Sequence, residues 1–182
     1  AEQVSEGVVG LYTHAAGGRI RFITDSPYVA IKVKMGTWRM SHFALTGSAG
    51  FDMFAEYDGK NRYAGSFMPP FTFKSEYEGV KDFDLEYTED NTCEKIITLD
   101  MPLYSTVVNL YIGLKEGSVL KEAPEYSNEK PVVYYGSSIT QGGCASKPGS
   151  CYQNILSRRF NQDYINLGFS GSAKAEDAMI DY

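Results

Sequence analysis

The sequence predicts two unlike parts, an all-β domain of the β-sandwich or jelly-roll kind and then the start of an α/β domain. From Val8 to about Leu120, short β-type runs alternate with Gly and Pro turns, which is typical of a sandwich. A polar segment with two prolines, 121–131, follows and predicts a linker. The order strand, helix, strand comes after it. We therefore predict a sandwich at 1–125, a linker at 126–131 and an α/β segment at 132–182.

The predicted sandwich strands come from alternating apolar and polar residues. Runs 19–24 and 28–34 both alternate, and the tight turn Asp25-Ser-Pro27 between them predicts a hairpin. Further strands are expected at 51–57, 62–67, 71–75, 82–87, 94–100 and 107–114. Eight short strands at this spacing are sufficient for a two-layered sheet structure.

The α/β segment is predicted from a change of pattern. A buried-type strand at 132–135 precedes a Gly/Ser turn, a helix at 151–160, a second strand at 164–167 and a last helix from about Lys174. The 52 residues from Pro131 to Tyr182 are fewer than the roughly 70–80 that a stable unit usually needs. We expect the chain to be cut within this domain, and its unfinished sheet edge favours pairing with another copy.

Composition excludes several classes of function. The chain has 182 residues, 43% hydrophobic and 22% charged, which is ordinary for a globular protein. A net charge of −6 argues against nucleic acid as a partner, and no run approaches the roughly 20 apolar residues of a membrane span. Ala1 begins the chain without a leader, so a mature form and a trimmed form both stay open.

Cysteine and histidine patterns predict no metal or cofactor. The cysteines are Cys93, Cys144 and Cys151, and none stands in a metal-ligand spacing. Cys144 and Cys151 are near enough in sequence for a disulfide, which the sequence alone leaves open. We expect no cofactor.

The most informative segment is 132–143, which reads V-V-Y-Y-G-S-S-I-T-Q-G-G. A strand that ends in a tight turn exposes a side chain at the sheet edge, so Ser138 is the candidate nucleophile. A phosphate-binding loop and a plain β-to-α turn are the alternatives, although the loop lacks the lysine and spacing of known phosphate motifs. Segment 166–171, N-L-G-F-S-G, follows the next parallel strand. The amide of Gly171 is therefore expected to approach the Ser138 hydroxyl and form an oxyanion hole.

These residues resemble the SGNH hydrolases, also called GDSL-type esterases. Gly136-Ser-Ser-Ile139 is similar to the family's nucleophile block, with Ser137 in the acidic position, and Phe169-Ser-Gly171 is similar to its second block. Gly50 and Asp52 match the G-x-D-L-Y signature of a subgroup with an N-terminal β-sandwich. The resemblance implies a flavodoxin-like α/β domain without cofactor. It also implies Ser138 as nucleophile and the amides of Ser138 and Gly171 as oxyanion donors.

The resemblance implies a serine esterase or deacetylase, acting on acetylated carbohydrate and exported to the periplasm or cell surface. The family's oxyanion asparagine and its Asp-x-x-His have no counterpart in the sequence, so we expect this chain to be inactive alone. His14 and His42 fall in the sandwich and are not expected to act as the base, and Asp163 and Asp181 receive no role.

The rival hypothesis is a non-catalytic module in which the sandwich binds a glycan or a protein and the α/β piece is vestigial. Aromatic residues make up 14% of the chain, and some could stack on sugar rings, although strand aromatics are more often core. The candidates are Trp38, Tyr57, Tyr63, Phe71 and Phe73.

Overall fold

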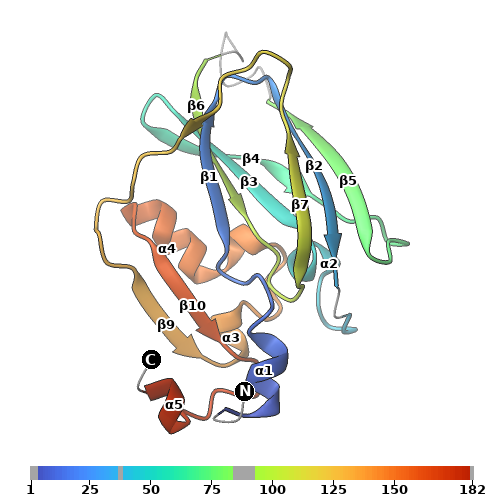
Figure 1. The fold of residues 1–182 in the computed structure, drawn as a ribbon, viewed down its shortest axis with the longest axis vertical. Coiled ribbons are helices and arrows are strands. Elements are labelled where there is room, and N and C mark those ends of the chain that lie inside the picture. The colour runs from blue at the N-terminus through green and yellow to red at the C-terminus, as the bar shows by residue number, and fades with distance from the viewer. Residues whose placement is uncertain (1–3, 37–38, 84–92, 181–182) are drawn as a thin grey trace.

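The structure is a computed structural model that describes residues 4–36, 39–83 and 93–180. It consists mostly of β-strands with a few short helices (Figure 1). One sheet has the strand order β4-β3-β6-β1-β8, a second has the order β5-β2-β7, and β10 and β9 form a separate pair. The strands are β1 Arg19–Thr24, β2 Tyr28–Met35, β3 Phe51–Tyr57, β4 Lys60–Phe67, β5 Glu76–Asp82, β6 Lys95–Asp100, β7 Val107–Gly113, β8 Lys121–Glu122, β9 Val132–Gly136 and β10 Tyr164–Gly168. The helices are α1 Glu6–Leu11, α2 Leu45–Ser48, α3 Ser138–Gln141, α4 Tyr152–Phe160 and α5 Asp177–Ile180, with a 3-10 turn at Pro148–Ser150.

The main core lies between the two antiparallel sheets. Alternate residues of β2, namely Val29, Ile31, Val33 and Met35, are buried, as the period of two along a strand requires. They join one apolar cluster with buried residues of β3 and β6 such as Met53. The two sheets thus share one core, as a β-sandwich does. The jelly-roll connectivity stays a prediction.

The predicted hairpin between the first two strands is wrong. Strand β1 pairs with β6 and β8, whereas β2 pairs with β5 and β7 in the other sheet. The turn side chains bind a distant segment: Asp25 accepts from the Val119 amide at 2.8 Å, and Ser26 Oγ accepts from the Lys115 amide at 3.1 Å. The turn is therefore a crossover between the two sheets, and these hydrogen bonds hold it in place.

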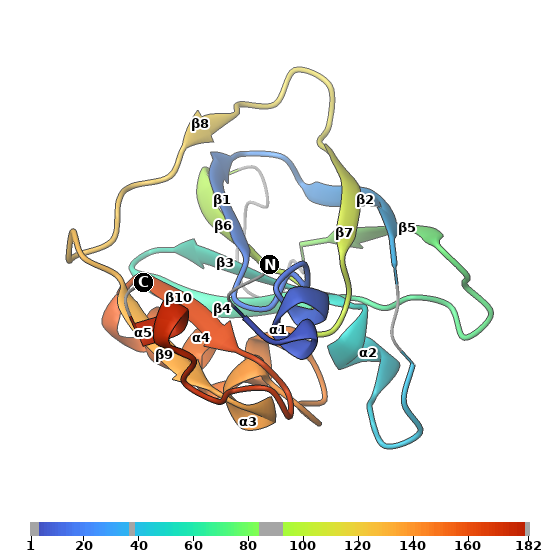
Figure 2. The same cartoon turned by 60° about the horizontal axis from the view of Figure 1, so that its bottom comes forward.

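Two other strand predictions need correction or lie outside the described residues. Residues 71–75 form a turn, in which the Phe73 amide donates to Pro70 O, and β5 begins at Glu76 instead. The run expected at 82–87 lies largely outside the described ranges. Helix α1 was not predicted; its Val8 and Leu11 pack against Phe169, which follows β10. Figure 2 shows α1 between α5 and α2.

The last part of the described chain contains the parallel pair. Strand β9 aligns with β10 from Val132 opposite Tyr164 to Gly136 opposite Gly168. Helix α4 connects the two strands and lies between them and the sandwich (Figure 1). The carboxyl ends of β9 and β10 therefore lie side by side, and the turns that follow both strands meet there.

Among the described helices, none is long and apolar enough to span a membrane.

Candidate active site

Ser138 lies at the first position of α3, directly after β9 and the bend at Ser137. Its carbonyl oxygen accepts hydrogen bonds from the Gly142 amide at 3.0 Å and the Gly143 amide at 2.6 Å. Gly142 has φ 102°, a backbone conformation that favours glycine, and it ends the short helix. The turn therefore fixes the backbone of Ser138 at the sheet edge, and its side chain is half-buried.

The second predicted site residue, Gly171, lies in the loop after β10. The Phe169 amide donates to Gly136 O at 2.8 Å and holds this loop against the end of β9. The Gly171 amide donates to Ser137 Oγ at 3.0 Å, so it contacts the residue before the candidate nucleophile. Gly171 has φ 70° and open space where a side chain would point. The oxyanion roles of Gly171 and Ser138 stay a prediction.

Gln141 connects the nucleophile turn to the second loop, and the sequence analysis missed it. Its fully buried side chain accepts from the Ser170 amide at 2.9 Å and donates to Leu103 O at 3.3 Å. Its Nε2 also lies 3.1 Å from His14 Nδ1. Only its spacing of three residues from Ser138, one helical turn, could have indicated it. Gln141 thus sets the position of the loop that carries Gly171.

Thr140 is held from two sides. Its carbonyl oxygen accepts from Gln153 Nε2 at 2.6 Å and from Asn166 Nδ2 at 2.8 Å. Gln153 belongs to α4 and Asn166 to β10, so these bonds join α3 to both elements. The short helix is kept in place by side chains, since its own length supplies little stability.

Asp52 anchors the segment behind the nucleophile to the sandwich. Its side chain is fully buried on β3, where Oδ2 accepts from the Gly149 amide at 2.7 Å and Oδ1 accepts from Ser66 Oγ. Burial raises the pKa of this carboxyl, and the hydrogen bonds from Ser66 and Gly149 oppose that rise. The aspartate of the G-x-D pattern therefore has a structural contact with the α/β segment.

Arg158 of α4 makes a second connection between the two parts. It donates to Asp100 Oδ2 at 2.8 Å and to Gly149 O at 2.6 Å, and its guanidinium lies 3.7 Å from the centre of the Phe54 ring. Burial raises the pKa of Asp100 to about 7, with the nearby Asp52 charge adding to the rise and Arg158 opposing it. This pair is mostly removed from water, as its position between sheet and helix requires.

No histidine within the described ranges hydrogen-bonds Ser138. His14 is half-buried beside Gln141, and burial lowers its pKa. His42 is exposed and packs edge-on against Phe43 at 4.6 Å between ring centres. Asp163 forms an ion pair with Arg19 at 2.5 Å, and Asp181 lies outside the described residues. The expected absence of a base for Ser138 stays a prediction.

The remaining candidates are also placed by the structure. Cys93, Cys144 and Cys151 are free, so the possible bridge is absent. Phe73 is buried against Tyr77 and cannot stack on a sugar, whereas Phe71 is 88% exposed. Trp38 lies outside the described residues. No cluster of potential metal ligands occurs in the described part of the chain.

Two family models match the sequence. The family model for the N-terminus of SGNH hydrolase-type esterases, named GxDLY, matches residues 1–120. The model of the GDSL-like lipase/acylhydrolase family matches residues 129–182. The chain therefore belongs to the GDSL-like, SGNH-type hydrolases with a GxDLY N-terminus. A search of curated proteins found no significant match.

Two solved structures are similar to this chain. A protein described as a GDSL-like lipase from Bacteroides ovatus is 34% identical, with a TM-score of 0.84 over 96% of this chain. The salicylyl-acyltransferase SsfX3 from a tetracycline biosynthetic pathway is 21% identical and shares the fold, with a TM-score of 0.68 over 93% of this chain. The chain spans 50% of the first protein and 44% of the second, about half the length of each.

Proposed function

We propose that this chain supplies the nucleophile and an oxyanion amide of a serine esterase or deacetylase that acts on acetylated carbohydrate. One observation carries the proposal: the turn after β9 presents Ser138 while the loop after β10 brings the Gly171 amide to within 3.0 Å of the adjacent Ser137 hydroxyl. Family membership supports the esterase chemistry. The carbohydrate substrate and the exported location come from the family resemblance.

In this mechanism Ser138 Oγ attacks the acyl carbon of the ester while a base takes its proton. The tetrahedral intermediate places a negative charge on the former carbonyl oxygen, which the amides of Ser138 and Gly171 stabilise. The alcohol leaves with a proton, and water then releases the acid from the acyl-serine. The Ser137 hydroxyl, which now accepts from Gly171, would yield this amide to the oxyanion.

The rate contributions of the catalytic groups indicate how active the 182 residues can be alone. Each oxyanion donor is worth about 10²–10³ in rate, whereas loss of the nucleophile or base costs on the order of 10⁶. Because no histidine within the described ranges hydrogen-bonds Ser138, the second number dominates. We therefore propose that the base comes from residues outside this sequence and that the 182 residues alone do not hydrolyse esters.

The test compares the purified 182 residues with a longer protein that contains them, using 4-nitrophenyl acetate and an acetylated oligosaccharide. We expect no turnover by the short chain, and turnover by the longer protein that falls by about 10⁵–10⁶ in Ser138→Ala. Ser137→Ala is the matched control and should retain activity within about tenfold. Full activity of the Ser138→Ala protein would exclude Ser138 as nucleophile. Glycan binding without turnover would favour the binding module.

A further inference from the structure

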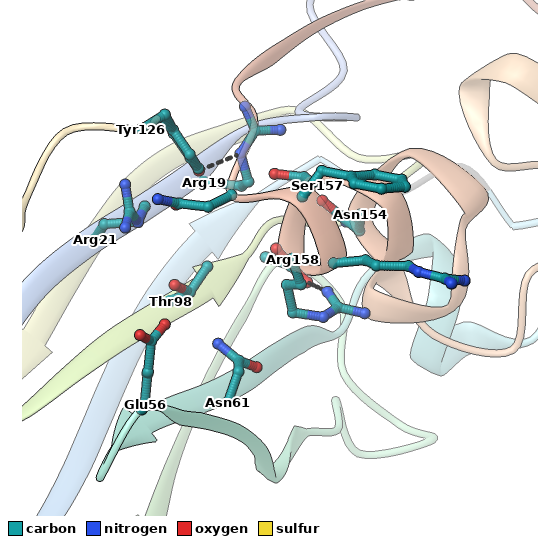
Figure 3. A pocket seen from close by; sticks show the side chains of 14 residues that line it. Arg19, Arg21, Glu56, Asn61, Thr98, Tyr126, Asn154, Ser157 and Arg158 are labelled. Atoms are coloured by element: carbon teal, nitrogen blue, oxygen red, sulfur yellow. Dashed lines mark hydrogen bonds and ion pairs between the residues drawn. The ribbon is translucent and has the colours of Figure 1, made fainter. Parts of the chain in front are cut away.

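A polar pocket of about 380 Å³ lies between the sandwich and helix α4, and it includes neither Ser138 nor Gly171 (Figure 3). Its volume is within the range of small-molecule sites. The charged groups in its lining are Arg19, Arg21, Arg158, Arg159, Glu56 and Asp100. Four guanidinium groups thus face two carboxyl groups, in a chain whose net charge is −6. This local excess of positive charge needs an explanation.

Two of the four arginines have structural partners. Arg19 pairs with Asp163 at 2.5 Å and lies 3.8 Å from the centre of the Tyr164 ring. Arg158 pairs with Asp100 at 2.8 Å. Their charges are largely neutralised by partners that the fold supplies. Arg19 and Arg158 therefore form part of the pocket wall, and the positive charge without an acidic partner belongs to Arg21 and Arg159.

Arg21 and Arg159 supply the unmatched charge. Arg21 donates to Pro124 O at 3.0 Å and lies 4.1 Å from the centre of the Tyr126 ring, without an ion pair. Arg159 is exposed, and within the described ranges it makes no hydrogen bond or ion pair; its guanidinium lies 5.6 Å from the centre of the Phe160 ring. A guanidinium with free N–H groups at a concave surface is suited to bind a carboxylate.

Other groups in the pocket could bind hydroxyls. The Glu56 carboxylate makes no ion pair with any described residue, and Figure 3 shows it beside Thr98 and Asn61 on the floor formed by the sheet. Glu56, Thr98 and Asn61 in the lining offer polar side-chain atoms that can pair with ligand hydroxyls. The rings of Tyr126 and Phe160 add flat apolar surfaces to the lining.

We propose that this pocket binds a carboxylate-bearing sugar of the uronic acid class. The carboxylate is recognised by Arg21 and Arg159, and the ring hydroxyls donate to the side-chain oxygens of Glu56 and Asn61. A phosphate dianion is less suitable, since it has little hydrogen to donate and Glu56 repels its second charge. A neutral sugar would leave the two guanidinium groups unmatched. The proposal does not depend on the esterase chemistry at Ser138.

The test is calorimetric titration of the 182-residue chain with D-galacturonate, D-galactose and inorganic phosphate at low salt. We expect galacturonate to bind at least about tenfold more tightly than galactose and phosphate, because the carboxylate and the hydroxyls are both used. Arg21→Gln and Arg159→Gln should each weaken galacturonate by about tenfold or more. Lys115→Gln, which removes one positive charge from an exposed residue outside the pocket, should leave binding unchanged.

Two further controls separate a binding defect from a folding defect and from binding at the esterase site. Thermal unfolding verifies that the two arginine variants are folded, and Ser138→Ala should bind galacturonate as the wild type does. Equal binding of galactose, tighter binding of phosphate, or unchanged binding in Arg21→Gln and Arg159→Gln would each overturn the proposal. Loss of binding in Ser138→Ala would also overturn it, because the ligand would then occupy the esterase site.

Discussion

Asp52 and Asp100 lie directly opposite each other on β3 and β6, and both carboxyl groups are buried. The two carboxyl groups have different hydrogen-bond donors. Asp52 accepts from Ser66 Oγ and the Gly149 amide, and Asp100 accepts from Arg158. Because the two carboxyl groups are neighbours in a buried site, the ionisation of one disfavours the ionisation of the other. The pair therefore links the sandwich to the segment behind Ser138 at an electrostatic cost.

The first prediction concerns Asp100 and pH. Its pKa is raised from 3.8 to about 7, so between these values the folded state binds more protons than the unfolded state. Its contribution to stability is therefore complete below about pH 4, falls as the pH rises towards 7, and is constant above that. Urea unfolding of the wild type and Asp100→Asn from pH 4 to 8 should show a stability difference that decreases with pH. A difference that does not vary would contradict the raised pKa.

The second prediction concerns Asp52. Asp52→Ala leaves the Gly149 amide without its acceptor and should lower the free energy of unfolding by about 2–3 kcal/mol. Asp52→Asn retains an acceptor oxygen and should lose less. Urea unfolding measures both values, and amide exchange at Gly149 should become faster in the alanine variant. Equal stability of the two variants would show that the hydrogen bond to Gly149 contributes little.

The third prediction concerns Gln141 as a positioning residue. Gln141→Ala removes the bonds to the Ser170 amide and Leu103 O and leaves a buried amide unpaired, with an expected loss of about 1–3 kcal/mol. Amide exchange at Ser170 and Gly171 should become faster because the loop loses its support. Gln141→Glu keeps the acceptor for Ser170 and should restore slow exchange at that amide. Fast exchange in both variants would assign the positioning to another group.

The fourth prediction separates Ser137 from Ser138. Ser137→Ala removes the acceptor of the Gly171 amide and should lower the free energy of unfolding by about 0.5–1.5 kcal/mol, with faster exchange at Gly171. Ser138→Ala removes a hydroxyl that no described residue hydrogen-bonds, so stability should stay within about 0.5 kcal/mol. Thermal unfolding and amide exchange measure both. The opposite order would show that Gly171 contacts Ser138 in solution.

Local patterns predicted many elements because alternation along a strand depends on near neighbours. The run expected at 107–114 corresponds to β7 Val107–Gly113, and the helix expected at 151–160 corresponds to α4 Tyr152–Phe160. Pairing could not be predicted, since the crossover after β1 depends on contacts of Asp25 with Val119, 94 residues away. Helix α1 was missed because Val8 and Val9, as β-branched residues, favour strands.

The sequence indicated some residues of the candidate site and missed others. The rule that segments after parallel strands meet at one edge predicts where Ser138 and Gly171 lie: Ser138 begins the helix after β9, and Gly171 lies in the loop after β10. Their catalytic roles stay a prediction. Gln141 and Arg158 were missed because their partners are far away in sequence, such as Leu103 at 38 residues and Asp100 at 58. The unmatched arginines of the pocket are equally invisible in the sequence, because only the fold shows which of them have acidic partners.

The bond from Asp52 to Gly149 has an evolutionary consequence, because it crosses 97 residues and joins the two parts of the chain. A chimaera that combined this sandwich with the α/β half of a distant relative would keep two buried acids, and it would satisfy them only if that half placed a backbone amide at Asp52 and an arginine at Asp100. Recombination between relatives should therefore be tolerated only when residue 52 and the stretch around residue 149 are inherited together.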